Sequence, residues 1–187
     1  MKADQEDPRQ LNAEGVSVSL THSPLDVLST MASVRSPKAG ATVVFAGTAP
    51  APNWQQAPAE EVVLGTTRDN FEDKPVTQLE YSSYPPLALR TMLAIGHAMK
   101  LKHKLTAISI VHRLGVVPIG EESILVAVSA PHREAAWRGG EEALEECKEK
   151  VEVWKLEEFG GVEGGVWRAN RNGAIGLPVK TQDPSEE

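Results

Sequence analysis

One stretch decides the fold of this chain: residues 123–136, Ser-Ile-Leu-Val-Ala-Val-Ser-Ala-Pro-His-Arg-Glu-Ala-Ala. Its first part, 123–130, is a short apolar run rich in β-branched residues, which predicts a buried strand. From His132 to Lys150 apolar residues recur every three or four positions, as in a helix with one buried stripe. The residues of that stripe are Trp137, Gly140, Leu144, Cys147 and Val151. A buried strand that leads directly into a helix therefore stands at the centre of the predicted fold.

The preceding part of the chain shows both the apolar runs of strands and the three-to-four-residue apolar spacing of helices. Period-two or short apolar runs predict strands over 16–20, 41–46, 77–81 and 105–111. A helix is predicted after Ser23-Pro24, with Leu25, Leu28 and Met31 on one side, and another after Tyr84-Pro85-Pro86, with Leu89, Met92, Leu93 and Gly96 facing inward. Residues 115–122 suit a loop or hairpin. This order of elements predicts an α+β fold with a mixed, mostly antiparallel sheet and flanking helices.

The ends of the chain and one internal segment differ in composition from the rest. Residues 1–14 are polar and acidic, and residues 176–187 are rich in proline and acidic side chains, so both are predicted to be disordered tails. Residues 48–65 contain closely spaced prolines and no apolar period, which predicts an exposed loop. One folded domain over 15–175 is the resulting organisation, and 187 residues are enough for one substantial core.

The overall charge excludes some classes of function. The chain has a formal net charge of −7, so a broad basic surface for nucleic acid is not expected. The single cysteine, Cys147, excludes an internal disulfide, and the acidic first residues do not resemble a signal peptide. No run approaches the roughly 20 apolar residues that span a membrane. A soluble, cytosolic protein is expected.

Against this acidic background, cationic and titratable side chains gather within residues 132–155. They are His132 and Arg133 at the start of the predicted helix, Lys148 near its end, and Lys155 in the segment that follows. Arginine and lysine are the usual ligands of phosphate and carboxylate groups. The pattern predicts a local, fixed anion site.

Each of these residues also has an ordinary structural interpretation. Lys148 is spaced from Glu145 and Glu152 as a lysine is in a solvated helix ion pair. The pair His132 and Arg133 would equally serve to begin a helix and to make surface contacts.

Further polar groups have similar alternatives. The pair His112 and Arg113 ends a predicted strand and is expected to pair with a carboxylate. Cys147 lies in the apolar stripe and is expected to be a small buried hydrophobe. The five histidines lack the spacing of a metal site, and neither a GxxxxGK loop nor a GxGxxG turn occurs. Neither a metal nor a resident cofactor is therefore predicted.

A set of motifs in a fixed order resembles one protein family, the catalytic (large) subunit of molybdopterin synthase. The resemblance covers about residues 40 to 172. The motifs are Thr66–Glu72, Leu79–Tyr81, Val111–Gly115 with Pro118, residues 123–136, Lys148, Val153–Lys155 and Trp167. A long ordered set of this kind is far more specific than any one motif.

The resemblance implies a fold, an activity and partners. The fold is an α/β hammerhead type, and the large subunit forms a homodimer that binds a small ubiquitin-like sulfur-carrier subunit at each end, giving a heterotetramer. The reaction transfers two sulfurs from C-terminal Gly-Gly thiocarboxylates of the carrier to cyclic pyranopterin monophosphate, which forms the molybdopterin dithiolene. Such an enzyme is a sulfurtransferase of molybdenum cofactor biosynthesis.

The resemblance also assigns roles to residues. His132, Arg133 and Arg68 are expected to bind the pterin and its phosphate. Lys148 is expected to be catalytic at the end of the carrier tail, with Lys155 in support. An electrostatic and proton-transfer role fits Lys148 better than a covalent one, because the neighbouring glutamates favour its charged form.

Two further substrate-binding candidates lie in less regular segments. Phe45 belongs to a Phe-x-Gly strand end that should border the pocket, and Arg171 follows Trp167 near the end of the domain. In the family the Phe-x-Gly strand runs almost directly into the Thr-x-Arg loop, but here residues 48–65 are inserted between them. A surface loop can absorb such an insertion at small entropic cost.

Two other functions agree less well with the residues. One is a non-catalytic dimeric adaptor that binds the ubiquitin-like carrier but has lost the pterin site. The other is a phosphate-ester hydrolase, which lacks both a metal set and an evident nucleophile and base.

Overall fold

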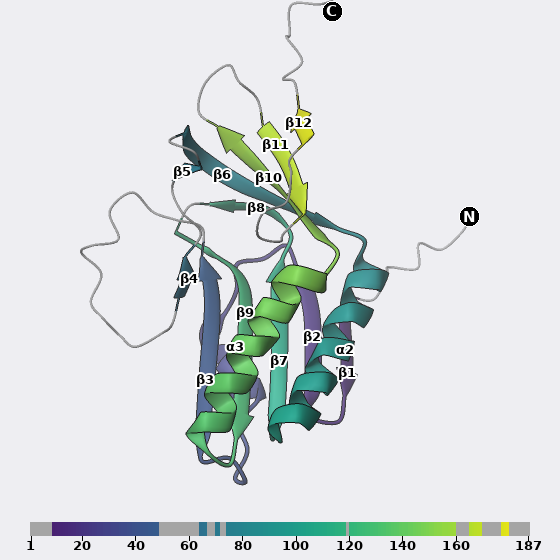
Figure 1. Ribbon diagram of the computed structural model, residues 1–187, viewed down its shortest axis with the longest axis vertical. Coiled ribbons are helices and arrows are strands. Elements are labelled where there is room, and N and C mark those ends of the chain that lie inside the picture. The colour runs from purple at the N-terminus through teal and green to yellow at the C-terminus, as the bar shows by residue number, and fades with distance from the viewer. Residues whose placement is uncertain are drawn as a thin grey trace, which may run out of the picture.

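The computed structural model describes residues 9–48, 64–66, 70–71, 74–118, 120–159, 165–169 and 177–179. In this part of the chain, the strands form two sheets, and there are three helices. Helices α2 and α3 lie side by side over one sheet, and the second sheet stands beyond the end at which α3 finishes (Figure 1). The helices are α1 (Val27–Ser33), α2 (Pro85–His103) and α3 (Arg133–Lys150).

Sheet 1 has the order β1-β2-β7-β9-β3-β4. Two of its strand pairs, β2–β7 and β3–β4, are parallel, and the other pairs are antiparallel. The mixed, mostly antiparallel sheet expected from the sequence is confirmed. Its strands are β1 (Gln10–Ala13), β2 (Val16–Thr21), β3 (Ala41–Thr48), β4 (Leu64–Thr66), β7 (Ala107–Arg113) and β9 (Glu122–Ala130).

Sheet 2 has the order β12-β11-β10-β6-β5, and β8 also pairs with β6. All of its strand pairs are antiparallel. The sequence predicted one sheet, and it predicted a loop or hairpin where β8 lies. The strands are β5 (Asn70–Phe71), β6 (Lys74–Ser83), β8 (Gly115–Pro118), β10 (Val153–Phe159), β11 (Gly165–Ala169) and β12 (Leu177–Val179).

The centre of the core is β9, as its apolar run predicts. Every residue from Ser123 to Ala130 is buried. The strand lies between β7 and β3 in the sheet, and both α3 and α1 contact it. Helix α2 covers the neighbouring strands β2 and β7, and α3 covers β3 and β9. An alternating strand would expose one face, so the uniformly apolar sequence of β9 matches a strand covered on both sides.

Helix α1 begins later than the sequence predicted. Its N-cap is Asp26, whose carboxylate accepts a hydrogen bond from the Ser29 backbone N–H at 3.0 Å. The predicted start at Ser23 is wrong, because the aspartate satisfies the first free amide groups of the helix. The predicted apolar side is also wrong at Leu28, which is 72% exposed.

The buried stripe of α3 is confirmed except at its first member. Gly140, Leu144, Cys147 and Val151 are buried, whereas Trp137 is 41% exposed. The ring of Phe45, from β3, packs beneath this part of the helix, so the larger tryptophan ring lies at the edge of the core.

Short strands occur in segments that the sequence assigned to tails and to the loop. Strand β1 lies within 1–14 and pairs with β2, and β12 lies within 176–187 and pairs with β11. These parts of the predicted tails are therefore ordered. In the 48–65 segment, Thr48 belongs to β3 and Leu64 begins β4, while 49–63 lie outside the described residues.

The chain passes from sheet 1 to sheet 2 at the end of β7, where His112 is buried. Gly115, with φ +76°, begins β8 immediately after this strand. The imidazole of His112 packs edge-on against Tyr81 of β6 at 5.1 Å, and its Nδ1–H donates to the Arg113 carbonyl at 2.8 Å. Burial lowers the pKa of His112 to about 4, although the hydrogen bond to the carbonyl acts in the opposite direction.

Arg113 has the carboxylate partner that the sequence predicted. Its guanidinium forms an ion pair with Glu121 and donates to the Val116 carbonyl at 3.2 Å. The guanidinium therefore connects the end of β7 to the β8–β9 segment.

The burial of His112 predicts an acid-sensitive stability. Below pH 6.5 the unfolded chain protonates this imidazole, while the folded chain keeps it neutral until the pH approaches 4. The free energy of unfolding should therefore fall as the pH drops through this window, by up to about 3 kcal/mol from this group. Urea titrations of the wild type and of His112→Gln from pH 7 to pH 4 measure it. A steeper loss in the wild type is expected, and equal slopes would contradict the assignment.

Candidate active site

His132 and Arg133 lie where β9 passes into α3. His132 is the N-cap residue, with extended backbone angles and no capping hydrogen bond from its side chain, and Arg133 is the first helical residue. Both are exposed. The free amide groups and dipole of a helix N-terminus favour anions, so the position suits the anion-binding role that the sequence predicted.

Lys148 lies in the last turn of α3. Its Nζ is 3.0 Å from a Glu145 carboxylate oxygen, and its side chain is 33% exposed. Glu152, the other predicted partner, instead accepts a hydrogen bond from the Thr91 hydroxyl at 3.1 Å. The helix ion pair is therefore present, but a partly exposed pair of this kind contributes little stability and leaves the amine able to act elsewhere.

Lys155 is the third residue of β10 and points to the same side of sheet 2 as two other residues. It lies directly opposite Tyr81 of β6 and Arg168 of β11. Directly opposite residues in antiparallel strands have their Cβ atoms about 5 Å apart. The lysine, the arginine and the buried tyrosine thus form a row across the sheet. Sequence reasoning could not pair Arg168 with Lys155, because their register depends on the alignment of β10 with β11.

The structure does not bring the whole cationic cluster together within one copy of the chain. Arg133 and Lys148 stand at opposite ends of α3, which separates their Cα atoms by about 22 Å at the helical rise. Lys148 and Lys155 lie at the end next to sheet 2, and His132 and Arg133 lie at the far end (Figure 1). The predicted site is therefore split into a histidine–arginine half and a lysine half.

Of the other three predicted site residues, one is buried in the core and two lie outside the described residues. Phe45 is 3% exposed, and its ring packs under α3 against Trp137. Arg68 and Arg171 lie outside the described residues.

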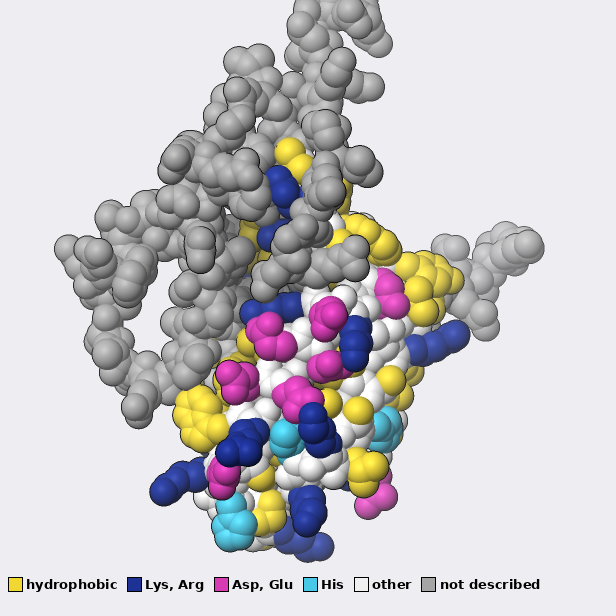
Figure 2. All heavy atoms as spheres, in the orientation of Figure 1, with side chains coloured by type: hydrophobic (Ala, Val, Ile, Leu, Met, Phe, Trp, Pro, Cys, Tyr) yellow, Lys and Arg dark blue, Asp and Glu magenta, His cyan; other side chains and the backbone are white. Residues whose placement is uncertain are grey.

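The face that carries α2 and α3 has an uneven charge. Acidic side chains gather over its middle, lysine and arginine side chains lie toward both ends, and histidine side chains lie toward the end where α3 begins and α2 finishes (Figure 2). At that end Glu142 of α3 binds both Lys102 and His103 of α2, the latter at 2.7 Å. These two donors, Lys102 first, hold the pKa of the Glu142 carboxyl below its usual value.

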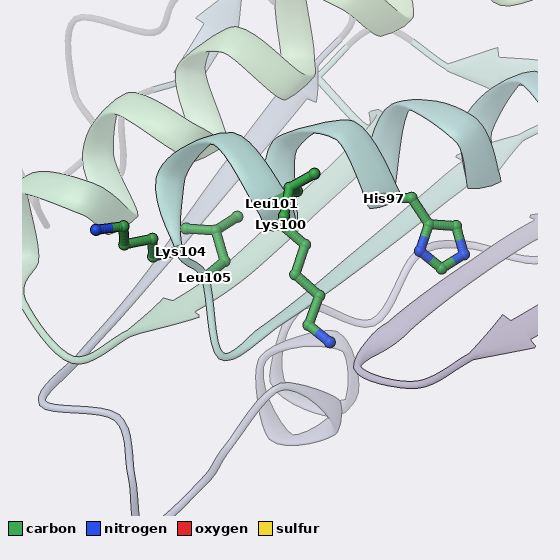
Figure 3. Close-up of a pocket in the computed structure, with 5 residues that line it drawn as sticks. All are labelled: His97, Lys100, Leu101, Lys104 and Leu105. Carbon is green, nitrogen blue, oxygen red and sulfur yellow. The ribbon is translucent and has the colours of Figure 1, made fainter.

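A shallow hollow of about 470 Å³ lies along the C-terminal part of α2, lined by His97, Lys100, Leu101, Lys104 and Leu105. Lys104 and His97 stand at opposite ends of this hollow (Figure 3). The Lys100 amine donates to the Glu14 carbonyl at 2.7 Å. The polar groups that line the hollow therefore do not converge on one point as those of a catalytic pocket do.

Cys147 is buried in the stripe of α3, as the sequence predicted. Burial, and secondly the charge of Glu146, raise the pKa of its thiol to about 12. The thiol is therefore neutral and inert at physiological pH. Among the described residues, histidine, cysteine and carboxylate side chains do not gather in threes as a metal site needs, and none of the helices is suited in length and polarity to crossing a membrane.

Comparison with known proteins identifies relatives over most of the chain. Residues 51–150 match the family model described as MoaE protein. A protein of Sclerotinia sclerotiorum named molybdopterin synthase catalytic subunit is 60% identical over 179 residues, which cover 96% of this chain and 81% of that protein. A protein of the same name from Neurospora crassa is 59% identical, covering 92% of this chain and 75% of the relative.

Solved structures have the same fold. The crystal structure of molybdopterin synthase from Staphylococcus aureus matches with a TM-score of 0.66 and 30% identity, covering 80% of this chain and 94% of that one. A chain from a complex of subunits 1 and 2 of molybdopterin-converting factor from Helicobacter pylori matches with a TM-score of 0.57 and 20% identity, covering 76% and 85%. The family model, the fungal relatives and the ordered motifs agree, and the chain belongs to the MoaE protein family, whose fungal relatives named above are molybdopterin synthase catalytic subunits.

Proposed function

We propose that this chain catalyses sulfur transfer to cyclic pyranopterin monophosphate in the cytosol, with a small ubiquitin-like carrier as the sulfur donor. Two carrier thiocarboxylates would each give up one sulfur, and the product is the molybdopterin dithiolene. The observation that carries the proposal is the pair Lys148 and Lys155 at one end of α3, in a chain 60% identical to a named catalytic subunit. Sulfur comes from the carrier, so the proposed reaction needs no resident metal or cofactor.

The split cationic cluster supports a pocket that two copies of the chain complete. His132 and Arg133 of one copy would bind the phosphate of the pterin, and Lys148 and Lys155 of the other copy would meet the end of the carrier tail. A rigid helix keeps these groups about 22 Å apart within one copy. Association about a two-fold axis would create two equivalent pockets, and one carrier at each makes a heterotetramer.

The contacts of Lys148 support an electrostatic role. The Lys148 amine forms an ion pair with the Glu145 carboxylate at 3.0 Å, and an ammonium group in such a pair is not a nucleophile. An ammonium group can hold the thiocarboxylate and offset the negative charge that develops on its acyl oxygen. It can also donate a proton to a leaving group. Lys155, beside Arg168, would add positive charge on the other side of the tail.

Substitution of Lys148 tests its role directly. In an assay with purified chain, thiocarboxylated carrier and cyclic pyranopterin monophosphate, Lys148→Arg should lower kcat at least about 100-fold, because the guanidinium cannot donate its proton. Lys150→Arg is the matched control, since that exposed lysine also pairs with a glutamate on the same helix and should keep full activity. Wild-type turnover by Lys148→Arg would exclude an essential amine. Carrier binding by the wild-type chain without any dithiolene product would instead favour a non-catalytic adaptor.

Mixing two inactive variants tests the shared pocket. Arg133→Ala and Lys148→Ala should each be nearly inactive as pure dimers. Half of the dimers formed after subunit exchange in an equal mixture carry both variants, and each of these has one intact pocket, so the mixture should regain about a quarter of wild-type activity. The control is the double variant Arg133→Ala/Lys148→Ala, which should stay inactive because none of its dimers has an intact pocket. Continued inactivity after exchange, verified by mass spectrometry of differently tagged subunits, would show that both residues act within one copy.

The buried thiol leads to a further expectation for the same assay. Cys147→Ala should keep turnover within about twofold of the wild type, because a neutral buried thiol cannot carry sulfur. The thermal midpoint should fall by a few degrees from the lost packing. A large loss of kcat with an unchanged carrier affinity would assign the cysteine a chemical role.

A further inference from the structure

Trp137 is a large aromatic side chain that α3 leaves partly in solvent. Its spacing along the helix matches the buried stripe, yet 41% of it is exposed. A single exposed apolar side chain is common and by itself indicates nothing. What distinguishes Trp137 is that its position is supported from below and that it stands beside the predicted phosphate ligand.

The support comes from Phe45. The two ring centroids are 5.7 Å apart and the planes are nearly perpendicular, at 89°, which is a favourable edge-to-face geometry. Phe45 is itself fixed, because it is 3% exposed and lies against Gly140, where an added Cβ would be 2.3 Å from its ring. The absence of a side chain at Gly140 thus allows a buried ring to hold the tryptophan in place.

Arg133 precedes Trp137 by four residues on the same helix. Side chains at this spacing are neighbours, with Cβ atoms about 6 Å apart. Both are exposed, and the helix N-terminus with His132 lies alongside them. In the part of the chain that the structure describes, Arg138 is paired with Glu134 at 2.9 Å, whereas no ion pair involves Arg133. A cation and a supported aromatic ring therefore stand next to each other on one turn of α3.

This arrangement fits a ligand that is both anionic and flat. An aromatic side chain binds the face of a heteroaromatic ring by stacking, as in single-stranded nucleic acid sites, and arginine binds phosphate through its planar fork. We propose that Trp137 is a substrate-binding residue whose indole stacks on the pterin ring while Arg133 holds the phosphate. The inference rests on the proposed function, and it assigns to Phe45 the role of positioning Trp137.

Substitutions at Trp137 test the stacking. With saturating carrier, Trp137→Leu should raise KM for cyclic pyranopterin monophosphate about tenfold while kcat changes little, and Trp137→Phe should stay within about threefold of the wild type. Trp154→Leu is the matched control, because Trp154 is exposed to a similar extent, 44%, but lies on β10. The KM of this variant for cyclic pyranopterin monophosphate should equal that of the wild type. Thermal midpoints identify any variant whose loss comes from unfolding.

Equilibrium binding separates this inference from the proposed function. Isothermal titration of cyclic pyranopterin monophosphate into each dimer needs no turnover, and Trp137→Leu should weaken binding by the same factor as KM. A wild-type chain that binds the pterin but forms no dithiolene would overturn the proposed function and leave the stacking to be decided by titration. Wild-type affinity in Trp137→Leu, or equal losses in the leucine and phenylalanine variants, would overturn the stacking. A wild-type chain that does not bind the pterin would overturn both.

Discussion

The rest of the structure depends on the burial of β9 on both faces. Its backbone is paired on both edges, with β7 and with β3, and its side chains are covered by α3 and α1. A strand with apolar side chains on both faces would expose them to water in any position but the covered centre of the sheet. Because α3 follows after a short turn at Pro131, the strand also fixes where the helix begins, and hence where His132 and Arg133 stand.

Helix α3 then acts as a rigid spacer between two chemically different ends. At its start are exposed groups suited to a phosphate, and at its finish is an amine held by a carboxylate. The acidic face between them discourages an anionic ligand from binding along the helix instead of at its ends (Figure 2). One chain thus presents two partial sites, and this separation is the basis of the proposal that two copies complete each pocket.

The sequence was sufficient to predict the features that depend only on the local spacing of apolar residues. Strand β9, helix α3 and the burial of Cys147 follow from apolar spacing, and so does the mixed α+β class. It was insufficient where pairing is non-local. Strand β8 has no apolar period of its own and is a strand because Val117 pairs with Leu79 of β6. The proximity of the four cationic groups was likewise read from their closeness in the chain, but a helix separates residues that a compact loop would bring together.

The parallel pairing of β3 and β4 changes how the inserted segment is understood. Residues 46–48, at the end of β3, and 64–66, in β4, run in the same direction, so β4 begins opposite Ala46 and a tight turn after Thr48 could not lead into it. Parallel neighbours need a crossover of about a dozen residues or more, and a tight turn can join only antiparallel strands. A relative in which these two motifs are nearly contiguous could not make this pair. The added length is therefore what makes an extra edge strand topologically possible, and lineages that shorten it should lose that strand while keeping the other five of sheet 1.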